Sequence, residues 1–177
     1  MVNEDDQPLL LSVARQALEA RVAGLGTPEV QCVGPLALRC GAFVSIHKGS
    51  DLRGCLGRVS TDWALGRTLA HLGGAVADRD PRFPPVTVSE LPLLQIEISL
   101  LTPDRPISSL EEIEIGRHGL IVEHGYAQGL LLPQVATDHQ WDRPTFLEHA
   151  CMKAGLPRNA WKTGARIHIF EAHVFGG

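Results

Sequence analysis

The amino-acid sequence predicts an α+β fold (a two-layer α/β arrangement) in which a mainly antiparallel sheet is flanked by helices. Two short apolar segments, residues 41–47 and 52–59, are separated only by a few turn-forming residues, so they are expected to pair as a hairpin. Residues 93–101 alternate apolar and polar like a half-buried strand, and residues 8–22 repeat apolar side chains at helical spacing. The 177 residues, 44% hydrophobic and 20% charged, suit a single globular domain over residues 1–177, with room for a small subdomain.

The first helix is predicted near the N-terminus. Asp6 can cap it, and Pro8 stands in the first turn, where proline is tolerated. Gly24 and Gly26 end it, and residues 30–40 follow as irregular or weakly extended chain. Its apolar side consists of Leu10, Val13, Ala14, Ala17, Leu18 and Val22.

A second helix is predicted between the hairpin and the strand at residues 93–101. Thr61-Asp62 is expected to open it, and it should end near Asp78, because the proline-rich segment that follows cannot continue a helix. In the next strand, alternation puts Glu97 and Ser99 on the face opposite the apolar one. The apolar face of that strand is expected to be Leu94, Ile96, Ile98 and Leu100.

The C-terminal half is predicted to add short strands and one more helix. Residues 102–109 are expected to form a loop. Asp142 and Pro144 mark the start of the helix, and Gly155 marks its end. The strands are predicted at residues 113–115, 120–122, 130–132 and 167–175.

Charge and composition exclude several classes of protein. The net charge of −4 and the aromatic content of 5% argue against a nucleic-acid binder, which needs a concentrated basic surface or stacking platforms. The acidic start at Glu4, Asp5 and Asp6 is unlike a signal peptide, and no apolar run reaches the roughly 20 residues of a membrane span. A cytoplasmic protein without membrane contact is therefore expected.

Neither the cysteines nor the histidines form a metal-binding pattern. The four cysteines (Cys32, Cys40, Cys55 and Cys151) include no C-x-x-C pair, and the eight histidines include no H-x-x-H or H-E-x-x-H. The sequence therefore predicts no metal site. It also contains no phosphate-binding loop of the G-x-x-x-x-G-K-[ST] type and no G-x-G-x-x-G. No recognisable motif therefore holds a cofactor, and the sequence leaves the cofactor unknown.

The strongest candidate site is Leu52-Arg53-Gly54-Cys55-Leu56-Gly57. If this segment is extended, Leu52 and Leu56 share one face and Arg53 and Cys55 the other. A guanidinium beside a thiol favours the thiolate, so the pKa of Cys55 is expected to fall. Gly54 and Gly57 leave room for a ligand to approach the backbone. The structural alternative is that Cys55 is a buried small hydrophobe and that the glycines serve packing.

Two further groups of residues can supply polar chemistry. Asp80 and Arg82 offer a carboxylate and a guanidinium on a stiff loop, or they pair locally where the helix ends. Glu97 and Ser99 share one strand face, and a carboxylate within a sheet needs a partner, for which Arg53 or Arg82 is expected. A structural ion pair is the alternative to a catalytic network.

The sequence resembles the AMMECR domain family, also called protein A of the AmmeMemoRadiSam system. The matching motifs span nearly the whole chain in fixed order. They are Gly41-Ala42-Phe43-Val44-Ser45, Leu52-Arg53-Gly54-Cys55-Leu56-Gly57, Asp80-Pro81-Arg82-Phe83-Pro84-Pro85, Glu97-Ile98-Ser99-Leu100-Leu101, Gly119-Leu120-Ile121-Val122, Leu131-Leu132-Pro133-Gln134-Val135-Ala136, Phe146-Leu147, Lys153-Ala154-Gly155-Leu156 and Trp161.

The resemblance implies an antiparallel α/β domain with a smaller subdomain and a cleft bordered by Arg53, Gly54, Cys55 and Gly57. It also implies genomic company with a Memo-type protein and a radical SAM protein, but no defined reaction. Two positions depart from the pattern. Phe175 is followed by Gly176-Gly177 where an acidic residue is common, which weakens a role for a terminal carboxylate. Gly73-Gly74 replace an alanine pair, at a helix cost of about 1 kcal/mol each.

Two functional hypotheses follow. In the first, the chain is a component of an enzyme system with those partners, Cys55 is a nucleophile or covalent carrier, and Glu97 orients Arg53. In the second, it is a noncatalytic module that binds a small anion or a partner protein through Arg53, Gly54, Gly57, Asp80, Arg82 and Ser99. Whether the chain is an enzyme stays open on sequence alone.

Overall fold

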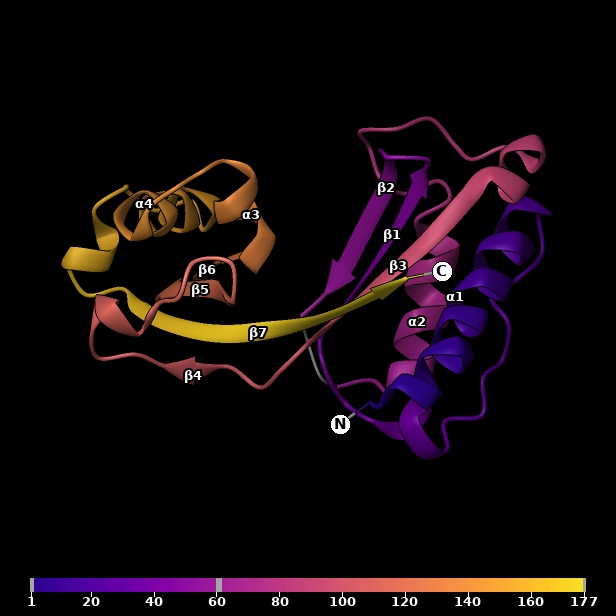
Figure 1. Ribbon diagram of the computed structural model, residues 1–177, viewed down its shortest axis with the longest axis horizontal. Helices are drawn as coiled ribbons and strands as arrows, with labels where there is room; N and C mark the ends of the chain where they lie inside the picture. Colours follow the sequence, from indigo (N-terminus) through magenta and orange to yellow (C-terminus); the bar gives the residue numbers. More distant parts are fainter. Residues whose placement is uncertain (1, 60–61, 177) are drawn as a thin grey trace. The chain divides into compact units, whose positions relative to one another are not determined.

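A computed structural model describes residues 2–59 and 62–176, which form two compact units. Unit 1 comprises the described residues up to 101 and residues 173–176, and unit 2 comprises residues 102–172. Helices and strands are mixed in both units, and the assigned strand pairs β1–β2, β1–β3, β5–β6, β5–β7 and β4–β7 are antiparallel (Figure 1). The predicted fold class is therefore confirmed.

Unit 1 packs two helices against a sheet in which β1 is the central strand, between β2 and β3. Ala42, Val44 and Ile46 of β1 are fully buried and the predicted apolar face of β3 is buried, so one side of the sheet forms the core with the helices. The strands are β1 (Ala42–Lys48), β2 (Asp51–Arg58) and β3 (Leu94–Leu101), and the helices are α1 (Gln7–Val22) and α2 (Leu65–Ala75).

The two helix starts differ from their predictions. The Asp6 side chain does not cap α1, because it accepts a hydrogen bond from the Asn3 amide (3.1 Å) within a preceding 3-10 turn. Helix α2 begins at Leu65 after Ala64. The expected opening residue Asp62 instead accepts hydrogen bonds from Arg58 (2.8 and 3.0 Å), and Thr61 lies outside the described residues.

Unit 2 packs helices against strands that centre on β7. Strand β7 pairs with β5, and β5 pairs with β6. Leu120 and Val122 of β5 are fully buried in the same core cluster as Phe146 and Leu147. The last residues of β7 belong to unit 1, whose core includes Phe175. The elements are β4 (Arg105–Pro106), β5 (His118–His124), β6 (Ala127–Leu131), α3 (Pro133–Asp138), α4 (Arg143–Lys153) and β7 (Arg166–Gly176).

Unit 2 also corrects the predicted strand at residues 113–115. This segment turns instead, because the Glu114 carbonyl accepts from the His118 amide (2.9 Å) and the Glu114 amide donates to the His118 ring (3.0 Å). Ile113 is fully buried in the core, and this burial explains an apolar residue at the position without a strand. Helix α4 begins as predicted, with Asp142 accepting from the Thr145 amide at 2.9 Å.

Within the described residues, no helix combines the length and hydrophobicity that crossing a membrane requires.

Candidate functional site

The candidate segment lies on β2 and contains a bulge at Arg53. Ile46 pairs with Gly54 and His47 with Leu52, so Arg53 is an extra residue without an opposite partner on β1. The bulge breaks the expected alternation. Leu52 lies opposite His47 and is 38% exposed, whereas Leu56 packs against the core. The prediction that Leu52 and Leu56 share a face is therefore wrong.

At the bulge, the Arg53 side chain contacts the segment that follows Asp80. Its guanidinium donates to both carboxylate oxygens of Glu90 (2.9 and 3.2 Å) and to the carbonyls of Pro84 (3.0 Å) and Pro85 (3.3 Å). The side chain is only 13% exposed. The Arg53 hydrogen bonds, followed by that of the Thr87 amide, lower the pKa of Glu90 to about 2. The expected pairing of Arg53 with Glu97 is therefore wrong.

Asp80 joins the same segment to the Cys55 backbone. Its carboxylate, 3% exposed, accepts a hydrogen bond from the Cys55 amide at 2.9 Å. It also accepts from the Arg82 side chain at 2.7 and 2.9 Å and from the Arg82 amide at 3.1 Å. Arg82 in turn donates to the Cys55 carbonyl at 3.4 Å. The Arg82 hydrogen bonds are the main reason that the pKa of Asp80 lies well below its usual range.

Gly54 and Gly57 are explained by close packing. A Cβ on Gly54 would lie 3.1 Å from both Val76 Cγ2 and the Val76 carbonyl at the end of α2. A Cβ on Gly57 would lie 2.1 Å from the Phe43 ring. Gly57 also lines a cavity of about 530 Å³, together with Arg21, Thr27, Leu56, His71, Leu72, Gly74, Ala75 and Arg79.

The thiol of Cys55 lies on the sheet face that is turned away from the unit 1 core. Ser45 pairs with Cys55 on one side and with Glu97 on the other, so three polar side chains form a row across three strands. His47 Nε2 lies 4.0 Å from Glu97 Oε1. Ser99 is on the same face, as predicted, but it is 3% exposed and lies opposite Phe43.

The electrostatic environment does not favour a thiolate at Cys55. Burial is the largest effect and raises the pKa of the Cys55 thiol. The Ser45 hydrogen bond and the positive charge of Arg82 lower it by less, and Asp80 and Glu97 raise it further. The expected lowering of this pKa by Arg53 is therefore wrong, because the bulge and Glu90 hold Arg53 elsewhere.

The structure thus unites Cys55, Asp80 and Arg82, places Glu97 beside them, and directs Arg53 to a separate ion pair. Sequence reasoning missed Ser45, His47 and Glu90. Ser45 and His47 could have been found by writing out the register of the predicted hairpin. Glu90 stands three residues after Thr87, the spacing of a capping box, which was the available signal. Across residues 2–59 and 62–176, no three His, Cys, Asp or Glu side chains are placed to hold a metal ion.

The fold and this site define an antiparallel α+β protein in which a glycine–cysteine strand is fastened to an Asp-Pro-Arg loop. The chain belongs to the AMMECR1 family, whose family model matches residues 11–175.

Relatives and a solved structure agree with this assignment. A protein of Methanosarcina acetivorans is 38% identical, with 99% of this chain and 93% of the relative aligned. Protein MJ0810 of Methanocaldococcus jannaschii is 43% identical, and the alignment covers 76% of this chain and 72% of MJ0810. The crystal structure of the uncharacterized protein PH0010 from Pyrococcus horikoshii superposes with a TM-score of 0.87 at 33% identity, covering 99% of this chain and 93% of that one.

Proposed function

We propose that this protein is a binding component of a multi-protein enzyme system with Memo-type and radical SAM partners, and that it acts through the Cys55 surface. We define that surface as Ser45, Cys55, Arg82 and Glu97. The observation that carries the proposal is the clamp of Asp80 and Arg82 on the Cys55 backbone, which fixes the surface before any partner arrives. Such preorganisation reduces the entropy lost on binding. The partners themselves are suggested by the resemblance to the AMMECR family.

The charges favour recognition of a partner over capture of a free anion by Arg53. Glu90 and two carbonyls already occupy the Arg53 guanidinium, which is largely buried. Arg82 is the accessible cation, with 57% of its side chain exposed, and Glu97 adds a carboxylate that is 40% exposed. A surface with both signs of charge suits a complementary protein surface.

A second candidate function is a covalent carrier at Cys55. The observation that favours it is the Ser45 hydroxyl beside the thiol, which together with Arg82 lowers the Cys55 pKa against the effect of burial. In this role the thiol needs a partner that brings a proton acceptor.

Binding of purified Memo-type and radical SAM proteins, measured by calorimetry, tests the proposal. Glu97→Lys should weaken binding at least about tenfold, because it reverses an exposed charge at the surface. Glu114→Lys is the matched control in unit 2, since Glu114 is also exposed (55%), and it should bind like the wild type. Equal affinity of Glu97→Lys and the wild type would overturn the proposal.

The Cys55→Ser variant separates the two candidates. As a binding component the protein should keep its affinity and the turnover of the reconstituted system after this change. If turnover is lost while both partners still bind, Cys55 is the carrier.

The described cysteines are all free thiols, in accord with the cytoplasmic location that we predict.

A further inference from the structure

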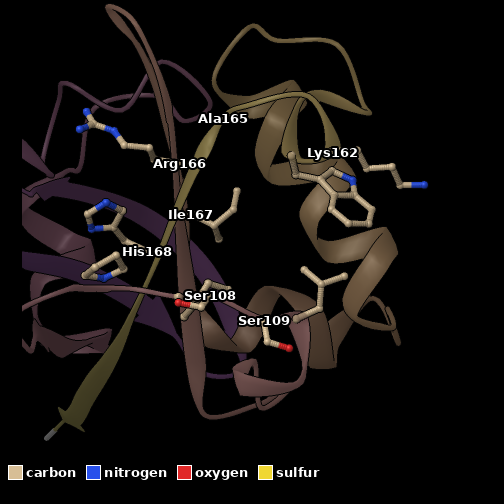
Figure 2. Close-up of a pocket in the computed structure, with 11 residues that line it drawn as sticks. Ser108, Ser109, Lys162, Ala165, Arg166, Ile167 and His168 are labelled. Carbon is tan, nitrogen blue, oxygen red and sulfur yellow. The ribbon is translucent and has the colours of Figure 1, made fainter.

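We propose that unit 2 contains a second, independent binding site, for a small carboxylate with an apolar body such as an aromatic acid. The site is a cavity of about 460 Å³ between the segment 106–110 and the segment 161–168 (Figure 2). Its volume lies in the ordinary range of small-molecule pockets. All of its lining residues belong to unit 2, so it shares no residue with the Cys55 surface.

Apolar side chains make up much of the cavity wall. In Figure 2, Ile167 points from β7 toward the middle of the cavity, whereas Arg166 and His168 project from the opposite side of the strand. Alternation along a strand explains this arrangement. The other apolar lining residues that pack against the unit 2 core are Ile107, Leu110, Trp161 and Ala165. Such walls favour a ligand with an aromatic or branched aliphatic body.

The rim offers one uncompensated cation. Arg166 pairs with Glu123 (3.1 Å), and a ring nitrogen of His168 lies 2.6 Å from Asp104, so each of these side chains already has a carboxylate partner. In Figure 2 the Lys162 side chain extends away from Ile167, and its ammonium lies 4.7 Å from the centroid of the Trp161 ring. Among the described residues, Lys162 forms no ion pair with a carboxylate. The flexible stem of a lysine lets such an ammonium meet a carboxylate at the cavity mouth.

The cavity rim also carries the exposed hydroxyl of Ser108. The Ser108 hydroxyl has no hydrogen-bond partner within the part of the chain that the structure describes, although the Ser108 amide donates to Glu112. The buried indole Nε1 of Trp161 likewise has no acceptor there. This nitrogen is closed off from the accessible surface, so it takes no part in binding a ligand in the cavity. The Lys162 ammonium, the Ser108 hydroxyl and the apolar walls together select a hydrophobic carboxylate.

Phenylacetate is a suitable probe. Two controls accompany it: phenylacetamide, which keeps the ring but is neutral, and acetate, which keeps the carboxylate but lacks the ring. The readout is the set of indole N–H signals in the two-dimensional NMR spectrum of the full chain, which contains three tryptophans; a Trp161→Phe spectrum assigns the Trp161 signal. Phenylacetate should shift the Trp161 signal saturably and leave the other two in place. Phenylacetamide should bind about tenfold more weakly, because it lacks the charge that Lys162 meets.

Two variants locate the site. Lys162→Gln should weaken phenylacetate about tenfold, and Lys153→Gln, which changes a lysine outside the cavity, should have no effect. Ala165→Leu should fill the cavity and abolish the shift, with circular dichroism confirming that the variant is folded. The proposal is overturned if phenylacetate leaves the Trp161 signal unchanged, if acetate produces the same shift, or if Lys162→Gln binds like the wild type.

Discussion

The carboxylate of Asp80 accepts a hydrogen bond from the backbone amide of Cys55 at 2.9 Å, across 25 positions of sequence. The same carboxylate holds the guanidinium of Arg82, which reaches back to the carbonyl of Cys55. A side-chain ion pair therefore occupies both backbone groups of one residue. This arrangement makes Asp80 a stabilising residue, with consequences that mutation can measure.

Replacing Asp80 with Asn should destabilise unit 1. Asn keeps the size of Asp but loses the charge that Arg82 meets and weakens the bond to the Cys55 amide, at a cost of about 2 kcal/mol. Urea unfolding measures the difference. Asp78→Asn is the control, because Asp78 also binds an arginine (Arg21, 2.6 Å) but is 29% exposed. Its cost should be under about 1 kcal/mol. Equal costs for the two variants would show that burial of Asp80 adds nothing.

Acid should remove the stability that Glu90 provides. Arg53 lowers the pKa of Glu90 from 4.5 to about 2, so the folded protein holds this proton less tightly than the unfolded chain does. The contribution is complete above pH 4.5 and disappears as the pH falls toward 2. The Glu90→Gln variant should therefore be less stable than the wild type at pH 7, by on the order of 2 kcal/mol, and should approach it at pH 2. The pKa of Asp80 is also lowered, but Asp80 is present in both the wild type and the Glu90→Gln variant, so its contribution cancels in the comparison. If the free energies of unfolding of the two proteins change in parallel with pH, Glu90 is not the source of this pH dependence.

Alkylation of Cys55 should become fast only at alkaline pH. Burial raises the pKa of the thiol, so the midpoint of the rate profile should lie above the ordinary value of about 8.5. Arg82→Gln should move the midpoint higher still, since the charge of Arg82 lowers this pKa. Arg79→Gln changes an exposed arginine that does not act on Cys55 and serves as the control. Mass spectrometry of the native protein follows each cysteine separately. A midpoint below that of a free thiol would restore the thiolate hypothesis.

The two neighbouring glycines of α2 should respond oppositely to alanine. A Cβ on Gly73 would lie 2.5 Å from the Ala14 carbonyl of α1, so Gly73→Ala must push the helices apart and should cost about 2 kcal/mol. Gly74 has its nearest neighbour at 3.5 Å, and Gly74→Ala should be neutral or stabilise the helix by up to about 1 kcal/mol. Thermal unfolding of both variants tests this difference. If Gly73→Ala is tolerated as well as Gly74→Ala, the helix contact is not as close as described.

The fold followed from local patterns because its helices and its hairpin are encoded by neighbouring residues. The spacing of apolar residues located α1, and alternation located β3 and its buried face. The local pairing of Asp80 with Arg82 was among the predicted alternatives and is confirmed. The bulge at Arg53 was not predictable in this way, because the Arg53 side chain binds Glu90, which is 37 positions away and lies outside any local pattern.

The same limit applies to the site. Extended chain implies strict alternation, so the sequence placed Arg53 beside Cys55, and a single inserted residue removed that relationship. Short segments with mixed patterns were also ambiguous. Ile113 is buried in a turn rather than in a strand, and Pro133 opens α3 as well as ending β6.

The position of β2 at the end of the described sheet gives the Asp80 clamp a further consequence. An outer strand presents unpaired amides and carbonyls, which a second molecule can use as a template for aggregation. Here the irregularity at Arg53 interrupts that template, and side chains already fill the hydrogen-bonding positions of Cys55. We therefore expect the loop from Asp80 to Glu90 to disfavour pairing of this edge with a second molecule, with or without any ligand.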